Sequence, residues 1–224
     1  MMRRPLVLLA AMLLSAPLLA RNHNVSFDGD NDYSTDCSAM NVRLDGDRVP
    51  ITTENVPVGN VRSLRVRTGS NGGIRVVGGS AWSVKACKAV APGLDPASVR
   101  VHFDGNEVSA SGPDDENWTL FFVVTTPANA TLDLAANNGP IGVRDFAGTL
   151  TAHTQNGPLS IRNSRGTIDA TATNGPISIT GGSGNVKLAA TNGPVSVKLD
   201  GASWEGGSLD ASTENGPVSL RIPR

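Results

Sequence analysis

The segment Asn156-Gly157-Pro158-Leu159-Ser160-Ile161-Arg162 returns in closely similar form as Asn174-Gly175-Pro176-Ile177-Ser178-Ile179-Thr180. The tripeptide Asn-Gly-Pro occurs five times in the second half of the chain, beginning at Asn138, Asn156, Asn174, Asn192 and Asn215. The residue number of the Asn thus advances by 18 three times and then by 23. A nearly fixed period of this length is typical of one supersecondary unit stacked on itself.

Each repeat contains two short strands. When the Asn is counted as position one, positions four and six are apolar in every repeat, and small or polar residues stand between them. A second alternating run follows a Gly at position eleven and has apolar residues at positions thirteen and fifteen. Alternation with period two indicates a strand with one buried face. Asn-Gly supports positive φ at the corner, and Pro opens the next strand, where a missing N–H does least harm.

One such unit cannot cover its own apolar face, so we expect the units to stack. Coils that rise by about 4.8 Å would pair in parallel around a core about 10 Å thick. The predicted fold class is all-β: a parallel β-solenoid (β-helix-like) whose two-strand coils have about 18 residues each, less regular in its N-terminal half. Ile161, Ile179 and Val197 should form one internal column.

The register extends upstream in a weaker form. Leu132, Leu134 and Ala136 match second-strand positions of a preceding coil, whose first strand would be Leu120 to Val124. Asn71-Gly72-Gly73-Ile74-Arg75-Val76 looks like a degraded copy of the Asn-Gly-Pro strand. Residues 99–110 alternate around Asp104-Gly105-Asn106, which predicts a hairpin.

The chain divides into three predicted segments: a signal peptide at 1–20, a polar N-terminal segment at 21–59, and the solenoid domain at 60–224 with regular repeats at 138–222. Arg3 and Arg4 precede an apolar run that ends at Ala20, the layout of a secretory signal. Leu18 is not the small residue preferred before a cleavage site, so cleavage and retention as an anchor both stay open. We expect an exported protein of the periplasm or cell surface, with no transmembrane span in the mature chain.

Composition agrees with an exported β protein. Aromatic residues make up 4% of the chain, 25 residues are Gly, and a net charge of −1 gives no drive towards nucleic acid. The chain has two cysteines, Cys37 and Cys87, and an even number in an oxidising compartment predicts a disulfide. This bond would covalently link the polar N-terminal segment to the solenoid. Two free thiols are the alternative.

The succession of these segments resembles a known family. The stretches Ser70 to Gly79 and Val123 to Leu134, followed by recurrent Asn-Gly-Pro strands, resemble the bacterial DUF4097 "putative adhesin" family over residues 60–222. The resemblance implies a β-solenoid outside the cytoplasmic membrane, and it brings no catalytic residues.

Motifs for catalysis or metal binding are absent from the sequence. His23, His102 and His153 are scattered, and no Gly-x-Ser-x-Gly or Cys-x-x-Cys occurs. An acidic cluster, Asp28, Asp30, Asp32 and Asp36, lacks the Gly and Glu of a calcium loop, so we expect a polar linker there. We therefore predict no enzyme activity, no metal and no cofactor.

A carbohydrate-active β-helix enzyme, a lyase or hydrolase, is the alternative. Asp133, Asp169 and Asp210 share position fourteen. Asp133 and Asp169 would lie two coils, about 9.6 Å, apart, near the upper limit for an inverting carboxylate pair.

The outward positions supply the one positive functional indication. Position seven carries Arg144, Arg162, Lys198 and Arg221, and position five carries Ser160, Ser178 and Ser196. Stacked cations repel one another, so this face could bind an anionic polysaccharide or lipid headgroups. Cations on exposed strands also protect against aggregation, and this alternative stays open. The ligand and the oligomeric state are not predicted.

Trp204 lies in the insertion that lengthens the fourth repeat, within Leu199 to Gly206. It could stack on a sugar ring, or it could fold over the last coil and close the core, which we favour because terminal repeats are commonly atypical. An ice-binding solenoid would need a regular Thr ladder, but position eighteen reads Asn137, Gln155, Thr173, Thr191 and Glu214.

Overall fold

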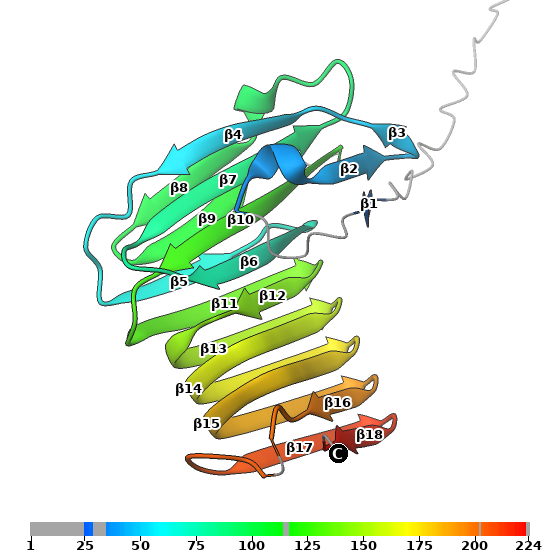
Figure 1. Ribbon diagram of the computed structural model, residues 1–224. Helices are drawn as coiled ribbons and strands as arrows, with labels where there is room; N and C mark the ends of the chain where they lie inside the picture. The colour runs from blue at the N-terminus through cyan, green and yellow to red at the C-terminus, as the bar shows by residue number, and fades with distance from the viewer. Residues whose placement is uncertain (1–24, 29–34, 114–116, 202, 223–224) are drawn as a thin grey trace, which may run out of the picture.

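The computed structural model describes residues 25–28, 35–113, 117–201 and 203–222. These residues form strands almost throughout, with two one-turn 3-10 helices, η1 (Cys37–Ala39) and η2 (Pro96–Ser98). The strands make a three-stranded sheet, β1 to β3, and a 15-stranded sheet that contains the others (Figure 1). The all-β prediction is confirmed. Within this described part of the chain, no helix is long and apolar enough to cross a membrane.

The repeats form a regular stack of strands in the C-terminal half of the ribbon (Figure 1). The strands are β11 (Ala130–Asn138), β12 (Ile141–Arg144), β13 (Ala147–Asn156), β14 (Leu159–Asn174), β15 (Ile177–Asn192), β16 (Val195–Lys198), β17 (Leu209–Asn215) and β18 (Val218–Arg221). Neighbouring repeats pair in parallel, with Leu159 beside Ile177 and Ile168 beside Val186. The pairing of β14 with β15 thus follows the period of the Asn-Gly-Pro repeat, as the sequence indicated.

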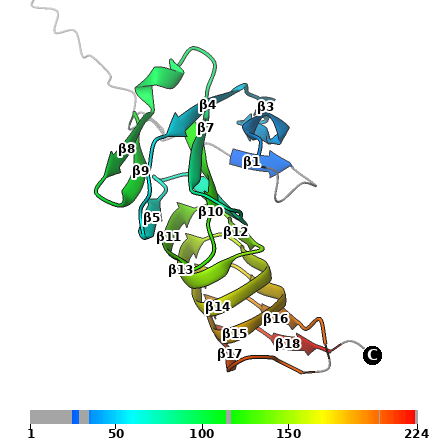
Figure 2. The same cartoon turned by 60° about the vertical axis from the view of Figure 1, so that its left-hand side comes forward.

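The stack has two walls, because β14 pairs with β12 through its first half and with β13 through its second half. We refer to the strands that follow Asn-Gly-Pro as the first wall and to those that precede it as the second wall. Figure 2 shows the two walls facing each other. Apolar side chains of both walls belong to one core cluster. The predicted internal column is confirmed: Ile161 pairs with Ile179 and Ile179 with Val197, and all three are at most 2% exposed.

The Asn-Gly corners stack directly on one another. The side chains of Asn138, Asn156, Asn174, Asn192 and Asn215 form a hydrogen-bonded ladder, in which Nδ2 of each later Asn donates to Oδ1 of the one before it at 2.8–3.0 Å. Nδ2 of the first, Asn138, donates to the carbonyl oxygen of Ser70. The positive φ expected at this corner belongs to the Gly, as in Gly175 with φ 156°. A Cβ on Gly175 would lie 2.1 Å from the carbonyl oxygen of Gly157, so the stacked backbones leave no room for a side chain.

The coil that precedes the regular repeats comes from residues far upstream. β5 (Ser63–Arg67) pairs with β11, and β6 (Gly72–Gly78) pairs with β12, with Ile74 beside Ile141. The segment at Asn71 is therefore a structural copy of the repeat strand, as its sequence indicated. The prediction that Leu120 to Val124 would be the first strand of this coil is wrong. Those residues lie in β10 (Trp118–Thr126), one strand further out, paired with β6.

An excursion of the chain between β6 and β10 causes this displacement. β7 (Ser83–Val90) lies antiparallel between β10 and β4 (Ile51–Val56), and β8 (Arg100–Asp104) forms the predicted hairpin with β9 (Glu107–Ser111). Because β4 precedes residue 60, part of the segment expected to be a polar N-terminal extension belongs to the large sheet.

A buried cation joins two of these strands. Lys88 of β7 is 7% exposed, and its Nζ donates to the carbonyl oxygen of Val99 at 2.6 Å and pairs with Glu54 of β4 at 2.5 Å. This ion pair anchors the edge strand β4 to its neighbour.

The N-terminal part is fastened to the large sheet by the predicted disulfide, which is confirmed. The small sheet consists of β1 (Val25–Asp28), β2 (Asn41–Leu44) and β3 (Asp47–Arg48). Cys37 of η1 is bonded to Cys87 of β7, with 5.4 Å between their Cα atoms. Both cysteines are buried with Phe121 and Val123, in a cluster separate from the main core. The predicted signal peptide lies outside the described residues.

Candidate functional site

The four cations that the sequence singles out lie in one register on the first wall. Arg144 lies beside Arg162, and Lys198 lies beside Arg221. Thr180 stands between Arg162 and Lys198. We call Arg144, Arg162, Lys198 and Arg221 the basic column.

The serines predicted beside these cations form a second column. We call Ser160, Ser178, Ser196 and Ser219 the serine stripe; each is aligned with the next by the parallel pairing of β14, β15, β16 and β18. The Oγ atoms of Ser160 and Ser178 lie 3.0 Å apart, and Ser219 donates to Ser196 at 3.2 Å. The stripe therefore presents short hydroxyl groups that are already ordered by one another.

The basic column is open to solvent along most of its length. Arg162, Lys198 and Arg221 are exposed, and the Nε atom of Arg144 lies 3.1 Å from Oδ2 of Asp145. Lys198 and Arg221 are on adjacent strands, about 4.8 Å apart along the stack. Arg162 and Lys198 are two rungs, about 9.6 Å, apart. This wall thus displays positive charge at multiples of one spacing.

Sequence reasoning missed Arg75 as a member of this surface. Arg75 of β6 lies beside Gly142, so it continues the serine stripe towards the N-terminal end of the stack. A small pocket of about 120 Å³ there is lined by Arg75, Phe121, Gly142 and Ser160, among others. The signal was available, because the degraded repeat at Asn71 places Arg75 at position five.

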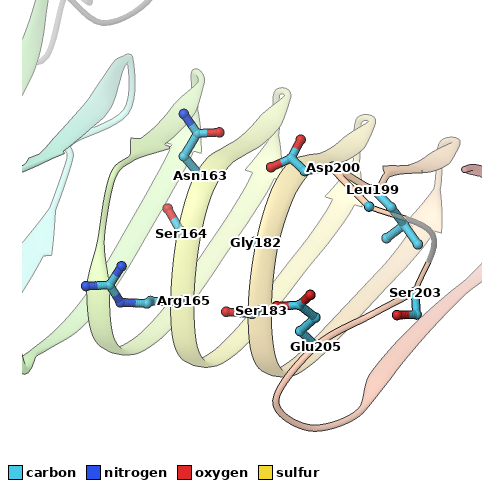
Figure 3. Close-up of a pocket in the computed structure, with 10 residues that line it drawn as sticks. Asn163, Ser164, Arg165, Gly182, Ser183, Leu199, Asp200, Ser203 and Glu205 are labelled. Atoms are coloured by element: carbon cyan, nitrogen blue, oxygen red, sulfur yellow. The ribbon is translucent and has the colours of Figure 1, made fainter. Parts of the chain in front are cut away.

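A larger cavity, about 420 Å³, lies at the corner where the first wall turns into the second (Figure 3). Asn163 and Asp200 lie on one side of it, Arg165 and Glu205 on the other, and Ser164 and Gly182 between them. Gly181 is needed here, because its φ is 65° and a Cβ would lie 2.1 Å from Oδ2 of Asp200. The lining carries both signs of charge, since Arg165 is basic and Asp200 and Glu205 are acidic.

The structure corrects the expectation that Trp204 closes the last coil. Its Nε1 donates to the carbonyl oxygen of Gly184 at 2.8 Å, and the half-buried ring packs against the main core. The carbonyl oxygen of Glu205 accepts from the Gly184 N–H at 2.9 Å. Trp204 therefore anchors the insertion to β15, one coil earlier than expected. Its indole N–H is occupied by this contact, and stacking of the ring on a sugar stays a prediction.

The second wall carries the aspartates of the enzyme alternative. Asp133, Thr151, Asp169, Lys187 and Asp210 are aligned across the strands. Asp133 is engaged by two cations: its Oδ2 lies 2.5 Å from Arg67 and 3.9 Å from Arg65. Asp133 is thus tied to two cations of the neighbouring strand β5.

The remaining candidate ligands serve local structure. His102 and His153 are exposed and contact Ser111 and Thr171 at 2.8 and 2.9 Å. Asp36 caps η1, and hydrogen bonds from the N–H and Oγ of Ser38 lower the pKa of its carboxyl. Among the described residues, no three His, Cys, Asp or Glu side chains cluster as a metal site would require. The side chains of Asp28, Asp30 and Asp32, and all of His23, lie outside the described residues.

Comparison with known proteins gives structural neighbours only. No protein-family model matches this chain, and no curated protein matches it. One similar solved structure is a "putative adhesin" from Bacteroides fragilis NCTC 9343, with 12% identity and a TM-score of 0.40, covering 76% of this chain and 97% of that chain. A "putative cell adhesion protein" from Clostridium sporogenes ATCC 15579 has 7% identity and a TM-score of 0.41, covering 78% and 100%. A "putative adhesin" from Parabacteroides merdae ATCC 43184 has 9% identity and a TM-score of 0.26, covering 78% and 96%.

Proposed function

We propose that this chain is an exported, non-catalytic, adhesin-like module of the cell envelope. In this proposal the repeats act as a β-solenoid, and the basic column with the serine stripe holds a polyanion, either an acidic polysaccharide or anionic lipid headgroups. Export is supported by the buried Cys37–Cys87 disulfide, since such bonds persist in oxidising compartments. The apolar run at the N-terminus agrees with export.

The observation that carries the proposal is the alignment of cations from separate repeats on one wall. An exposed ion pair contributes only about 0–1 kcal/mol by itself. A repeating polyanion, however, can meet several cations of a rigid wall at once, and the later contacts form without a new loss of translational freedom. The serine stripe lies beside the cations and offers hydroxyl groups to the same ligand. Weak contacts could therefore sum to useful affinity.

Binding of the mature chain to three probes tests the proposal: acidic polysaccharide, lipopolysaccharide, and vesicles that contain anionic lipids. In the test variant, Arg144, Arg162, Lys198 and Arg221 are all replaced by Gln. We expect its affinity to fall at least about tenfold, a loss of about 1.4 kcal/mol. We also expect wild-type binding to weaken with salt, because screening shortens to about 8 Å at physiological ionic strength.

The matched control removes the same charge elsewhere on the surface. It replaces four other exposed cations by Gln: Arg48, Arg62, Arg100 and Lys187. This variant should bind as the wild type does. An equal loss of affinity in both variants would show that binding depends only on net charge. Binding that does not change with salt, or that persists without the basic column, would refute the proposed site. The same cations would then serve solubility only.

A further inference from the structure

The last coil leaves an apolar strip uncovered. Val218, Leu220 and Ile222 are 50%, 57% and 49% exposed, whereas the residues at the same positions one coil earlier, Val195, Val197 and Leu199, are 0%, 2% and 5% exposed. The earlier residues are covered by the last coil. In the described part of the chain, β17 pairs only with β15 and β18 only with β16. The end of the stack is therefore an open double edge with an apolar centre.

The two edge strands carry opposite charges on their outer faces. β17 presents Asp210 and Glu214, and β18 presents Arg221, and all three side chains are exposed. Arg221 already lies beside Lys198, so an additional carboxylate would relieve repulsion there. A surface with an acidic strand next to a basic strand is complementary to a copy of itself that has been turned over.

We propose that two copies of this chain associate tail to tail through β17 and β18, about a two-fold axis parallel to these strands. The rotation places β18 of each copy on β17 of the other. Within one coil, β17 and β18 run in opposite directions. Rotation about an axis parallel to the strands does not change the direction in which either strand runs. Each new pair of β18 and β17 is therefore antiparallel. Both apolar strips become buried against each other, and the interface is closed. The dimer does not rest on the polyanion binding proposed above, although its interface shares Arg221 with the basic column.

The symmetry also determines the register. Rotation about this axis does not move a residue along the strand. A residue of β18 in one copy therefore pairs with a particular residue of β17 in the other copy, namely the residue equivalent to the one that it faces across the core of its own coil. The Asn215-Gly216-Pro217 corner is flanked by the inward residues Thr213 and Val218, which makes these two the first facing pair. Continuing outward, Ser212 meets Ser219, Ala211 meets Leu220, and Asp210 meets Arg221 of the second copy. Inward residues thus face inward residues, with Ala211 against Leu220, and the opposite charges of Asp210 and Arg221 coincide.

Other arrangements are disfavoured by the same charges and by topology. A two-fold axis perpendicular to the strands would place the acidic strand β17 against itself and would bring the two Arg221 strands together. Head-to-tail stacking would require the opposite end of the sheet to offer a coil edge. That end terminates in β4 and β8, each antiparallel to its neighbour.

Sedimentation velocity of the full chain over a range of concentrations tests the dimer. We expect a monomer–dimer equilibrium for the wild type. Asp210→Arg and Arg221→Asp should each weaken it at least about tenfold, because each creates two like-charge contacts in the homodimer. An equimolar mixture of the two variants should recover dimers, since in the mixed dimer each of the two ladders again joins a cation to a carboxylate. The control Asp169→Arg, at the equivalent position within the stack, should leave the equilibrium unchanged.

A covalent probe reports the register directly. Ser212→Cys and Ser219→Cys, both at exposed positions, should form an intermolecular disulfide when mixed under mild oxidation, since directly opposed residues have Cα atoms about 4.5–5.5 Å apart. Neither variant alone should cross-link. A wild-type chain that is monomeric at all concentrations, open-ended filaments, or a charge-swapped mixture that does not recover would overturn the proposal.

Discussion

At the scale of single residues, each member of Asn-Gly-Pro has its own physical role. The Asn side chain links coils through the asparagine ladder, as between Asn174 and Asn156 at 2.9 Å. The Gly allows stacked backbones to approach more closely than any Cβ permits, as at Gly175. The Pro carbonyl accepts a hydrogen bond from the coil before, as Pro176 does from Leu159 at 2.9 Å. The repeat is therefore a stacking motif as well as a turn.

The inward and outward faces of a strand should respond differently to charge. Ile179 is 1% exposed, and Ile179→Asp would bury a carboxylate without a partner, a cost of several kcal/mol that threatens a marginally stable domain. Ser178→Asp, one residue away on the outer face, should cost less than about 1 kcal/mol. Thermal unfolding followed by circular dichroism compares the two variants. Similar melting temperatures for both would show that the assigned faces are wrong.

At the scale of elements, a covalent link joins the N-terminal part to the large sheet, and an ion pair holds the edge strand β4 within that sheet. The disulfide connects η1 to β7, and the Lys88–Glu54 pair connects β7 to the edge strand β4. Both links act on β7, which lies antiparallel between β4 and β10. This strand is therefore the attachment point for the irregular end of the molecule.

Loss of the disulfide should destabilise the protein. The bond closes a loop with a sequence separation of 50. For a loop of this size the chain-entropy model gives up to about 4 kcal/mol. Denaturant unfolding with and without a reductant should show this difference, and the double variant Cys37→Ala, Cys87→Ala should be insensitive to the reductant. Two freely alkylated thiols in protein taken from the envelope would contradict the pairing.

At the scale of the whole molecule, the stack behaves as a one-dimensional array, because each coil contacts mainly its neighbours. Equivalent residues of successive coils lie side by side, as Leu159 does with Ile177 and Asn174 with Asn192. Removal of an entire coil should therefore leave each remaining coil with a neighbour in the same register.

We predict that deletion of residues 159–176, one full period, leaves a folded protein. Ile177 would then take the place of Leu159 beside Ile141, and every inward column would continue. Deletion of residues 159–177, one residue more, should disrupt the stack, because Ser178 would turn inward and Ile179 outward. Cooperative unfolding and the far-ultraviolet spectrum distinguish the two. Equal folding of both would mean that the period does not control the register.

The sequence by itself determined the features that repeat or that have few alternatives. These are the all-β class, the pairing of β14 with β15 at the repeat period, the alignment of Arg144 with Arg162, and the pairing of the two cysteines. Alternation and period are local properties, so they can be read from neighbouring residues.

Only the tertiary structure decided which distant segments meet. β6 rather than β10 lies beside β12, which brings Arg75 into line with the serine stripe. Trp204 packs at Gly184 and leaves Leu220 exposed at the end of the stack. The physical reason is that strands far apart in the chain, such as β6 and β10, compete for the same neighbour. Their apolar faces are similar, so the local alternation of apolar and polar residues does not show which strand pairs there.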